Sequence, residues 1–326
     1  MKSDTPYAEL SPEAVLDAME AAGYRCDGHA LALNSYENRV YQIGIDDAAP
    51  VVVKFYRPGR WTDAAILEEH AFAWELTAQE IPVVAPLSRG GISLHVHAGF
   101  RYAIFPRRGG RWPELGNADE RQWVGRFLGR IHRVGRAARF VHRTRLDVLE
   151  LGRKSRDVVL AGEWMPDYLA TKYADMTDLL LTEVESRTAG WRGAPLGRIH
   201  GDCHRGNILW TDAGPHFVDL DDCLTGPAIQ DLWMLLAGTQ QEMRSQLRDL
   251  LSGYEQFEAF DRAEIALIES LRALRMIHYS AWLARRWHDP AFPKAFPWFA
   301  EPRYWEEHYR ALEEQCDAVL APPLEL

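Results

Sequence analysis

The residues best suited to chemistry lie in one short stretch, His200 to Asn207, and in an acidic run soon after it. Asp202 is followed five residues later by Asn207, and twelve residues after that by Asp219. Alone, an Asp or Asn more often caps a helix or closes a turn. Together, hard oxygen donors of this kind suit Mg²⁺, which takes few protein ligands and completes its shell with water and phosphate oxygens. The spacing therefore predicts phosphoryl transfer.

A kinase site also needs a lysine on a strand, against the α- and β-phosphates, paired with a glutamate from a helix. Lys54 stands in the valine-rich run PVVVKFY (50–56), and Glu69 stands in the helical stretch that follows. Alone, Lys54 would more often be a solvated edge-strand lysine, and Glu69 an exposed helix residue. Both precede Asp202 in the chain, as a kinase requires, and this order favours the kinase interpretation.

Hydrophobic periodicity predicts the elements that position these side chains. In the first hundred residues we predict helices at 11–22 and 62–80 and strands at 38–45, 50–56, 92–97 and 100–105. After Gly110 helices dominate, and we predict them at 118–137, 175–187, 228–237, 241–259 and 263–287. Two strand-like runs within 198–222 would pair as a hairpin. The pattern predicts an α+β fold with a strand-rich lobe at 1–106 and a mainly helical lobe at 107–326, with ATP in the cleft between them.

Composition narrows the class of protein. The 326 residues are 47% hydrophobic and 26% charged, the balance of a chain able to bury a large core. A formal charge of −10 provides no basic field to hold a nucleic-acid backbone. No apolar run reaches the length of a membrane span, and the start MKSDTPYAELSPEA lacks a signal-peptide pattern. We therefore expect a cytoplasmic monomer with neither a nucleic-acid nor a membrane partner.

Two other chemistries are less well supported by the same stretch. His200 and His204 flank Asp202, but a metallohydrolase would need a third ligand at a recognisable spacing. We expect His200 to bond the backbone of its own loop instead. Cys203 next to His204 could suggest a thiol nucleophile, yet adjacent side chains point apart and no third group orients them. The acidic residues Asp221 and Asp222 are expected behind the metal ligands or in solvent.

Several motifs of the chain resemble those of a known protein family. HGDCHRGNILW (200–210) followed by VDLDD (218–222) resembles the signature of the aminoglycoside phosphotransferase and choline kinase family, which has a bilobal protein-kinase-like fold. NSYENRVYQ (34–42), VVKFYRPGRW (52–61), ILEEHAFA (66–73) and GPAIQDLWMLL (226–236) add a similarity to the bacterial stress response kinases within that family. The resemblance extends over nearly the whole chain.

The resemblance implies a role for each candidate residue. It makes Asp202 the catalytic base, and it makes Asp219, together with Asn207, a ligand of the catalytic Mg²⁺. Lys54 would pair with Glu69, which is preferred to Glu68. Ser35 would lie in the loop over the ATP phosphates, and the backbone near Phe105 would meet the adenine. One departure is plain, because the stretch NSYENRVY contains no glycine where protein kinases have a glycine-rich loop.

The family resemblance implies an ATP- and Mg²⁺-dependent phosphotransferase. Its acceptor would be a Ser or Thr of a protein, with autophosphorylation possible, in a bacterial stress response. An alternative acceptor is the hydroxyl of a small molecule such as an aminoglycoside, choline or a homoserine-like compound. A second alternative is a pseudokinase scaffold. The complete set of Lys54, Asp202, Asn207 and Asp219 stands against that reading, because a decayed enzyme should have lost at least one of them.

Overall fold

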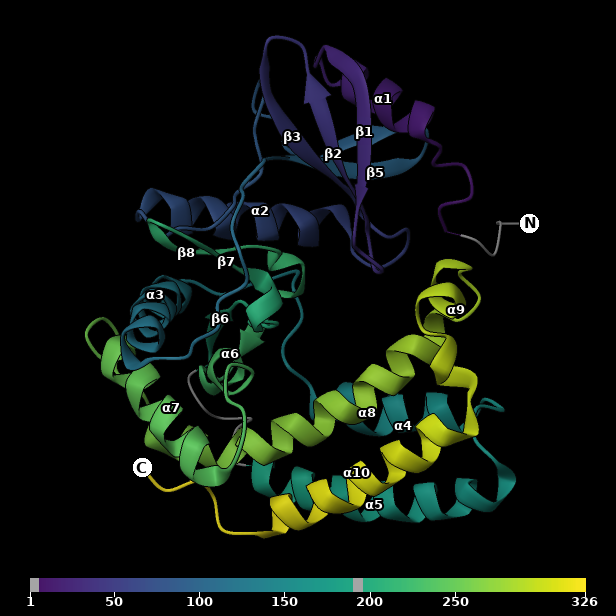
Figure 1. Cartoon of the computed structure of the whole chain (residues 1–326), viewed down its shortest axis with the longest axis vertical. Helices are drawn as coiled ribbons and strands as arrows, with labels where there is room; N and C mark the ends of the chain where they lie inside the picture. Colours follow the sequence, from purple (N-terminus) through teal and green to yellow (C-terminus); the bar gives the residue numbers. More distant parts are fainter. Residues whose placement is uncertain (1–5, 190–195) are drawn as a thin grey trace. The chain divides into compact units, whose positions relative to one another are not determined.

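The computed structural model describes residues 6–189 and 196–326 (Figure 1). These residues form two compact units. The first comprises the described residues up to Thr144 together with Gly197–Thr225 and Asp249–Ala259. The second comprises the described residues between Arg145 and Leu196 together with Gly226–Arg248 and Phe260–Leu326. The predicted lobe boundary after residue 106 remains a prediction.

A five-stranded antiparallel sheet dominates the first unit. Its strands are β1 (Cys26–Leu33), β2 (Arg39–Ile45), β3 (Ala48–Phe55), β4 (His95–His97) and β5 (Phe100–Pro106), in the spatial order β1-β2-β3-β5-β4. The predicted hairpin at 38–45 and 50–56 is confirmed as β2 and β3. The strand predicted at 92–97 is shorter, because a tight turn pairs Arg89 with Ile92 before β4 begins.

The side-chain alternation of β3 decides where Lys54 points. Val53 and Phe55 face helix α1 (Pro12–Ala21) and pack in the same core cluster as its residue Met19. Because successive residues of a strand point to opposite faces, Lys54 lies on the other face of the sheet. Helix α2 (Asp63–Ala78) packs on that side through Ile66, in contact with Ala103 of β5.

Helix α2 forms where the sequence predicts a helix at 62–80. Thr62 caps its amino end by accepting a hydrogen bond from the backbone N–H of Ala65, at 3.2 Å. The buried face recurs at helical spacing and comprises Ala65, Ile66, Glu69, His70, Phe72, Ala73 and Leu76. Glu69 is therefore a carboxylate on an otherwise mostly apolar face, which is costly unless a cation meets it.

The rest of the first unit carries the polar motifs. Helix α3 (Ala118–Arg136) confirms the helix predicted at 118–137 and packs on strand β6 (Gly197–Ile199), which pairs with β9 (Leu224–Gly226). The predicted hairpin is confirmed as β7 (Ile208–Thr211) and β8 (Gly214–Phe217), with Ile208 opposite Phe217. Short 3₁₀ turns, η3 (Arg205–Asn207) and η4 (Leu220–Asp222), lie on either side of this hairpin.

The second unit is helical. It contains a π-helical turn η1 (Leu149–Arg153), α4 (Lys154–Leu160), α5 (Asp167–Thr188), α6 (Ile229–Trp233), η5 (Arg262–Leu267), α8 (Ile268–Arg286), α9 (Ala291–Ala295), η6 (Pro297–Ala300) and α10 (Pro302–Leu320). Helix α7 (Gln240–Tyr254) contributes to both units. An aromatic core holds the second unit together, and in it the ring of Trp305 contacts both Tyr173 and Phe299. Among the described residues, no helix is both long and apolar enough to cross a membrane.

Candidate active site

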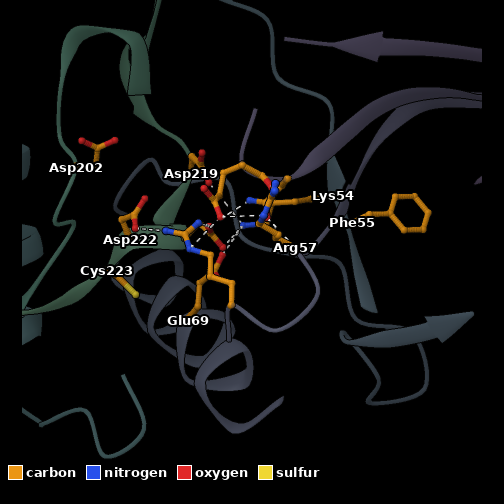
Figure 2. Close-up of polar contacts among 12 residues, drawn as sticks. Lys54, Phe55, Arg57, Glu69, Asp202, Asp219, Asp222 and Cys223 are labelled. Atoms are coloured by element: carbon orange, nitrogen blue, oxygen red, sulfur yellow. Dashed lines mark hydrogen bonds and ion pairs between the residues drawn. The ribbon is translucent and has the colours of Figure 1, made fainter. Parts of the chain in front are cut away.

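A buried ion pair joins the sheet to helix α2. The ammonium of Lys54 donates to the Oε1 atom of Glu69 at 2.8 Å, and the side chains are only 7% and 3% exposed. Figure 2 shows Lys54 pointing into a cluster of acidic side chains while its neighbour Phe55 points the other way. The pair follows from the alternation of β3 and from the place of Glu69 on the inner face of α2.

The neighbouring Glu68 has a different partner. Its carboxylate accepts hydrogen bonds from the backbone N–H groups of Val141, His142 and Arg143 at 2.7, 2.7 and 2.8 Å. Glu69, rather than Glu68, is thus the partner of Lys54, the choice that the family resemblance favoured. Glu68 instead ties α2 to the loop that follows α3.

Lys54 meets two further carboxylates. Its Nζ atom lies 3.6 Å from Oδ1 of Asp219 and 3.5 Å from Oδ1 of Asp221. Burial alone would lower the pKa of Lys54, but Glu69, Asp221 and Asp219 together raise it well above its usual value. The lysine is therefore a permanent cation, which a phosphate ligand has to be.

The loop between β6 and β7 holds Asp202 and Asn207 together. The side-chain amide of Asn207 donates to the backbone carbonyl of Asp202 at 3.0 Å and to its Oδ2 atom at 3.4 Å. The Nε2 atom of His200 lies 3.0 Å from the carbonyl of Val218, so His200 contacts backbone, but at the residue after β8 and not in its own loop as expected. Gly201 has a φ of +85°, and a Cβ atom there would lie 2.2 Å from the carbonyl oxygen of Asp222. Only glycine fits at that position.

Asp219 lies close to this loop because the hairpin folds back. The N–H of Val218 donates to the carbonyl of Asn207 at 3.0 Å, so the residue before Asp219 is fixed against the residue that ends the loop. Asp219 itself has left-handed backbone angles, φ 60° and ψ 67°, which are strained for a residue other than glycine. Its carboxylate is 51% exposed.

The donors present fit a magnesium ion. The amide oxygen of Asn207 and the half-exposed carboxylate of Asp219 are hard oxygen ligands, and Mg²⁺ is often held by one or two such groups with water and phosphate oxygens. Among residues 6–189 and 196–326, no group of three or more His, Cys, Asp and Glu side chains is arranged to hold a metal by itself. Two protein donors would leave the other coordination positions of Mg²⁺ to water and phosphate oxygens.

The phosphate-loop candidate lies in a turn of the sheet that carries Lys54, and the adenine candidate lies on a strand of the same sheet. Ser35 lies in the turn between β1 and β2, and Phe105 lies in β5, with its ring centre 5.4 Å from Nζ of Lys54. The turn ends at Asn38, whose buried side chain accepts from the backbone N–H of Arg57 at 3.1 Å and donates to Asp221 at 3.1 Å. The glycine-free loop is thus anchored at its end by side-chain bonds.

Comparison with known proteins identifies the family to which the chain belongs. A sequence model of the phosphotransferase enzyme family matches residues 29–268. The chain belongs to this family. It is 48% identical over 321 residues to stress response kinase A of Escherichia coli O157:H7, covering 98% of this chain and 97% of that protein. Serine/threonine protein kinase RdoA of Salmonella typhimurium is 48% identical over 322 residues, with the same coverage. The protein is therefore a kinase of this phosphotransferase family, and the resemblance predicted from its motifs is confirmed.

Solved structures of the family share the fold. An amicoumacin kinase in complex with AMP-PNP, Ca²⁺ and Ami superposes with a TM-score of 0.69 at 20% identity, over 94% of each chain. A microcompartment-associated aminopropanol kinase gives 0.65 at 19% identity, over 93% of this chain and 98% of the other. Identities this low concern the fold alone, and they confirm the predicted α+β kinase-like fold.

Some residues of this phosphotransferase site were missed from the sequence. Asp221 was expected behind the metal ligands or in solvent; its 2% exposed carboxylate excludes solvent, and its contacts with Lys54, Asn38 and Arg60 were not foreseen. Arg60 and Arg143 were not singled out at all. Arg143 donates from Nε to the carbonyl of Cys223 at 2.9 Å and from NH2 to the carbonyl of Asp221. The only sequence signal was the position of Arg60 in the block VVKFYRPGRW.

Proposed function

We propose that the protein transfers the γ-phosphoryl group of ATP, with Mg²⁺, to the hydroxyl of a serine or threonine in a protein substrate, in a stress response. One observation carries the proposal. The buried Lys54 is 2.8 Å from Glu69 and 3.6 Å from Asp219, so a fixed cation lies beside a candidate metal ligand. Kinase catalysis depends on this combination, because the transition state is stabilised by positioning and charge neutralisation.

In this proposal the catalytic loop handles the acceptor. Asp202 would orient the acceptor hydroxyl and take its proton as the new O–P bond forms and the bond from γ-phosphorus to the β–γ bridging oxygen breaks, releasing ADP. Asn207 holds the backbone and carboxylate of Asp202 through its amide, at 3.0 and 3.4 Å. That bond leaves the amide oxygen of Asn207 as the atom for the metal.

The remaining candidates would bind the nucleotide. Asn207 and Asp219 would hold Mg²⁺, which supplies charge neutralisation at the phosphate oxygens. Lys54 would contact the α- and β-phosphates while Glu69 fixes its ammonium. Ser35 would offer its hydroxyl to the phosphates from the β1–β2 turn, and the backbone at Phe105 would face the adenine.

The acceptor class rests on different support. The name of the Salmonella relative, a serine/threonine protein kinase, supports a protein acceptor. A second candidate is a small-molecule hydroxyl. It is favoured by the short connection between η4 and α6, since residues 223–228 leave no room for the long activation segment that eukaryotic protein kinases use near their peptide site.

The test is transfer of label from γ-labelled ATP. Purified protein is incubated with Mg²⁺ and either a generic protein substrate or a panel of amino alcohols and aminoglycosides. We expect label in protein, including the kinase itself, and none in Asp202→Asn. Asp212→Asn, on the exposed turn of the β7–β8 hairpin, is the matched control and should label like the wild type. Label only in small molecules would select the second candidate, and no transfer to any acceptor would favour a pseudokinase.

A further inference from the structure

Asp221 is a buried carboxylate that contacts three side chains lying 161 to 183 residues before it in the sequence. Its Oδ1 atom lies 3.5 Å from Nζ of Lys54 on β3, and its Oδ2 atom accepts from the amide of Asn38 at 3.1 Å. Arg60, from the loop between β3 and α2, also donates to Oδ2. A charge this deeply buried is stable only because cations and donors surround it.

Arg60 bridges several acidic side chains at once. One terminal nitrogen donates to Asp221 and the other to Asp222, while Nε lies 3.6 Å from Glu37 in the β1–β2 turn. The planar guanidinium can meet carboxylates in two directions, which a lysine ammonium cannot do with the same rigidity. The Arg60 side chain is only 17% exposed, so these contacts are held rather than exchanged with water.

The strained backbone of Asp219 needs such support. Left-handed angles at a non-glycine residue persist only where the surroundings over-determine them. The turn that follows, η4, is fixed by Arg60 through the carboxylates of Asp221 and Asp222 and by Arg143 through the carbonyl of Asp221. The metal-ligand candidate is thus held from the residues just after it.

Asp221 and Arg60 also anchor the glycine-free phosphate loop. Asn38 donates a hydrogen bond to Asp221 of η4, and Glu37 pairs with Arg60, which also binds η4. The end of the 34–38 turn is therefore linked to η4 both directly and through Arg60. We propose that Asp221 and Arg60 are positioning residues that clamp the phosphate loop to the Asp219 turn and so set the site that receives Mg-ATP. The proposal rests on the proposed function and deepens it.

A clamp of this kind predicts a specific kinetic signature. The clamp contacts η4, the turn that follows Asp219, and the end of the phosphate loop, whereas Asp202 lies in the loop between β6 and β7 with the other metal-ligand candidate, Asn207. Loss of residues that orient metal ligands typically costs 10–100-fold in metal affinity or activity. We therefore expect the Mg²⁺ concentration for half-maximal rate to rise about 10–100-fold in Arg60→Lys and in Asp221→Asn. The KM for the acceptor should change by less than about twofold.

The experiment is a Mg²⁺ titration of phosphotransfer at saturating ATP, with the melting temperature measured alongside. The matched control is Asp249→Asn, because Asp249 forms a similar partly buried pair with Arg121 on α3, at 2.8 Å. Asp221→Asn leaves buried cations without a counter-charge and can fail to fold. If it does, Arg60→Lys alone provides the test. A double variant should be no worse than the poorer single variant, because both changes open one clamp.

The outcomes separate the clamp from the proposed function. If the wild type transfers phosphate and Arg60→Lys responds to Mg²⁺ as Asp249→Asn does, the clamp is wrong while the kinase assignment stands. If the wild type itself shows no Mg²⁺-dependent transfer, the proposed function fails first. A raised Mg²⁺ requirement in Arg60→Lys, with the melting temperature and acceptor KM of the control, supports the clamp.

Discussion

Two adjacent glutamates of α2 should respond very differently to the same substitution. Glu69→Gln removes the charge that holds Lys54, whose ammonium still has Asp219 and Asp221 within 3.6 Å. Breaking a buried ion pair costs about 3–5 kcal/mol, and we expect a smaller loss of unfolding free energy, about 2–3 kcal/mol, because these two carboxylates remain. The freed ammonium should then turn toward them and away from phosphate. We expect kcat/KM for ATP to fall about 100-fold, which equals roughly 2.7 kcal/mol.

Glu68→Gln should weaken the fold instead of the chemistry. Three hydrogen bonds to a charged acceptor are worth about 1.5–3 kcal/mol each, but two of the three backbone donors lie at exposed residues and water can replace the acceptor. We therefore expect a loss of about 2–3 kcal/mol in unfolding free energy, similar to that of Glu69→Gln, with kcat/KM reduced less than about fivefold. Steady-state kinetics at 25 °C and denaturant unfolding measure both quantities. Equal losses of kcat/KM in the two variants would refute the assignment of Glu69 to Lys54.

Further predictions concern backbone geometry and acid sensitivity. Gly201→Ala should abolish activity and lower the unfolding free energy by more than about 3 kcal/mol, because its Cβ would overlap the carbonyl of Asp222. Gly28 has a matching φ of +86° but open space around it, so Gly28→Ala should cost only about 1–2 kcal/mol. Urea unfolding measures both. Burial alone would raise the pKa of Glu68, but its three backbone donors lower it. A carboxyl with a lowered pKa stabilises the fold above its unfolded pKa and loses that contribution as pH falls through the folded value. Between about pH 5 and pH 3 the wild type should therefore lose more stability than Glu68→Gln, and parallel pH profiles would count against the three-donor contact.

The candidate site was predictable where its residues are close in sequence. Asp202, Asn207 and Asp219 belong to one loop and the hairpin that follows it, so their spacing in the sequence predicts that they lie close together. The strand of Lys54 and the helix of Glu69 were predictable from local pattern, but the choice of Glu69 over Glu68 came from the family resemblance. Asn38 and Arg60 could not be found this way, because they meet Asp221 across 183 and 161 residues, and no local pattern records such a contact.

The fold was predictable to a similar limit. Strands and helices with one buried face carry a periodic signal, and β2, β3, α2 and α3 were found. Strand β1 was missed because it lies at the edge of the sheet with most of its residues exposed, so its sequence CDGHALAL has little apolar alternation. The predicted helix 263–287 begins as the 3₁₀ turn η5, a difference in winding that hydrophobic spacing does not resolve.

The central claim is that Asp219 binds the metal-nucleotide while Asp202 acts on the acceptor. Calorimetric titration of ATP, with and without Mg²⁺, into wild type, Asp202→Asn and Asp219→Asn tests it directly. We predict that Mg²⁺ tightens ATP binding equally in the wild type and in Asp202→Asn, although the latter transfers no phosphate. In Asp219→Asn the effect of Mg²⁺ should be reduced at least tenfold. An undiminished Mg²⁺ effect in Asp219→Asn would contradict the account.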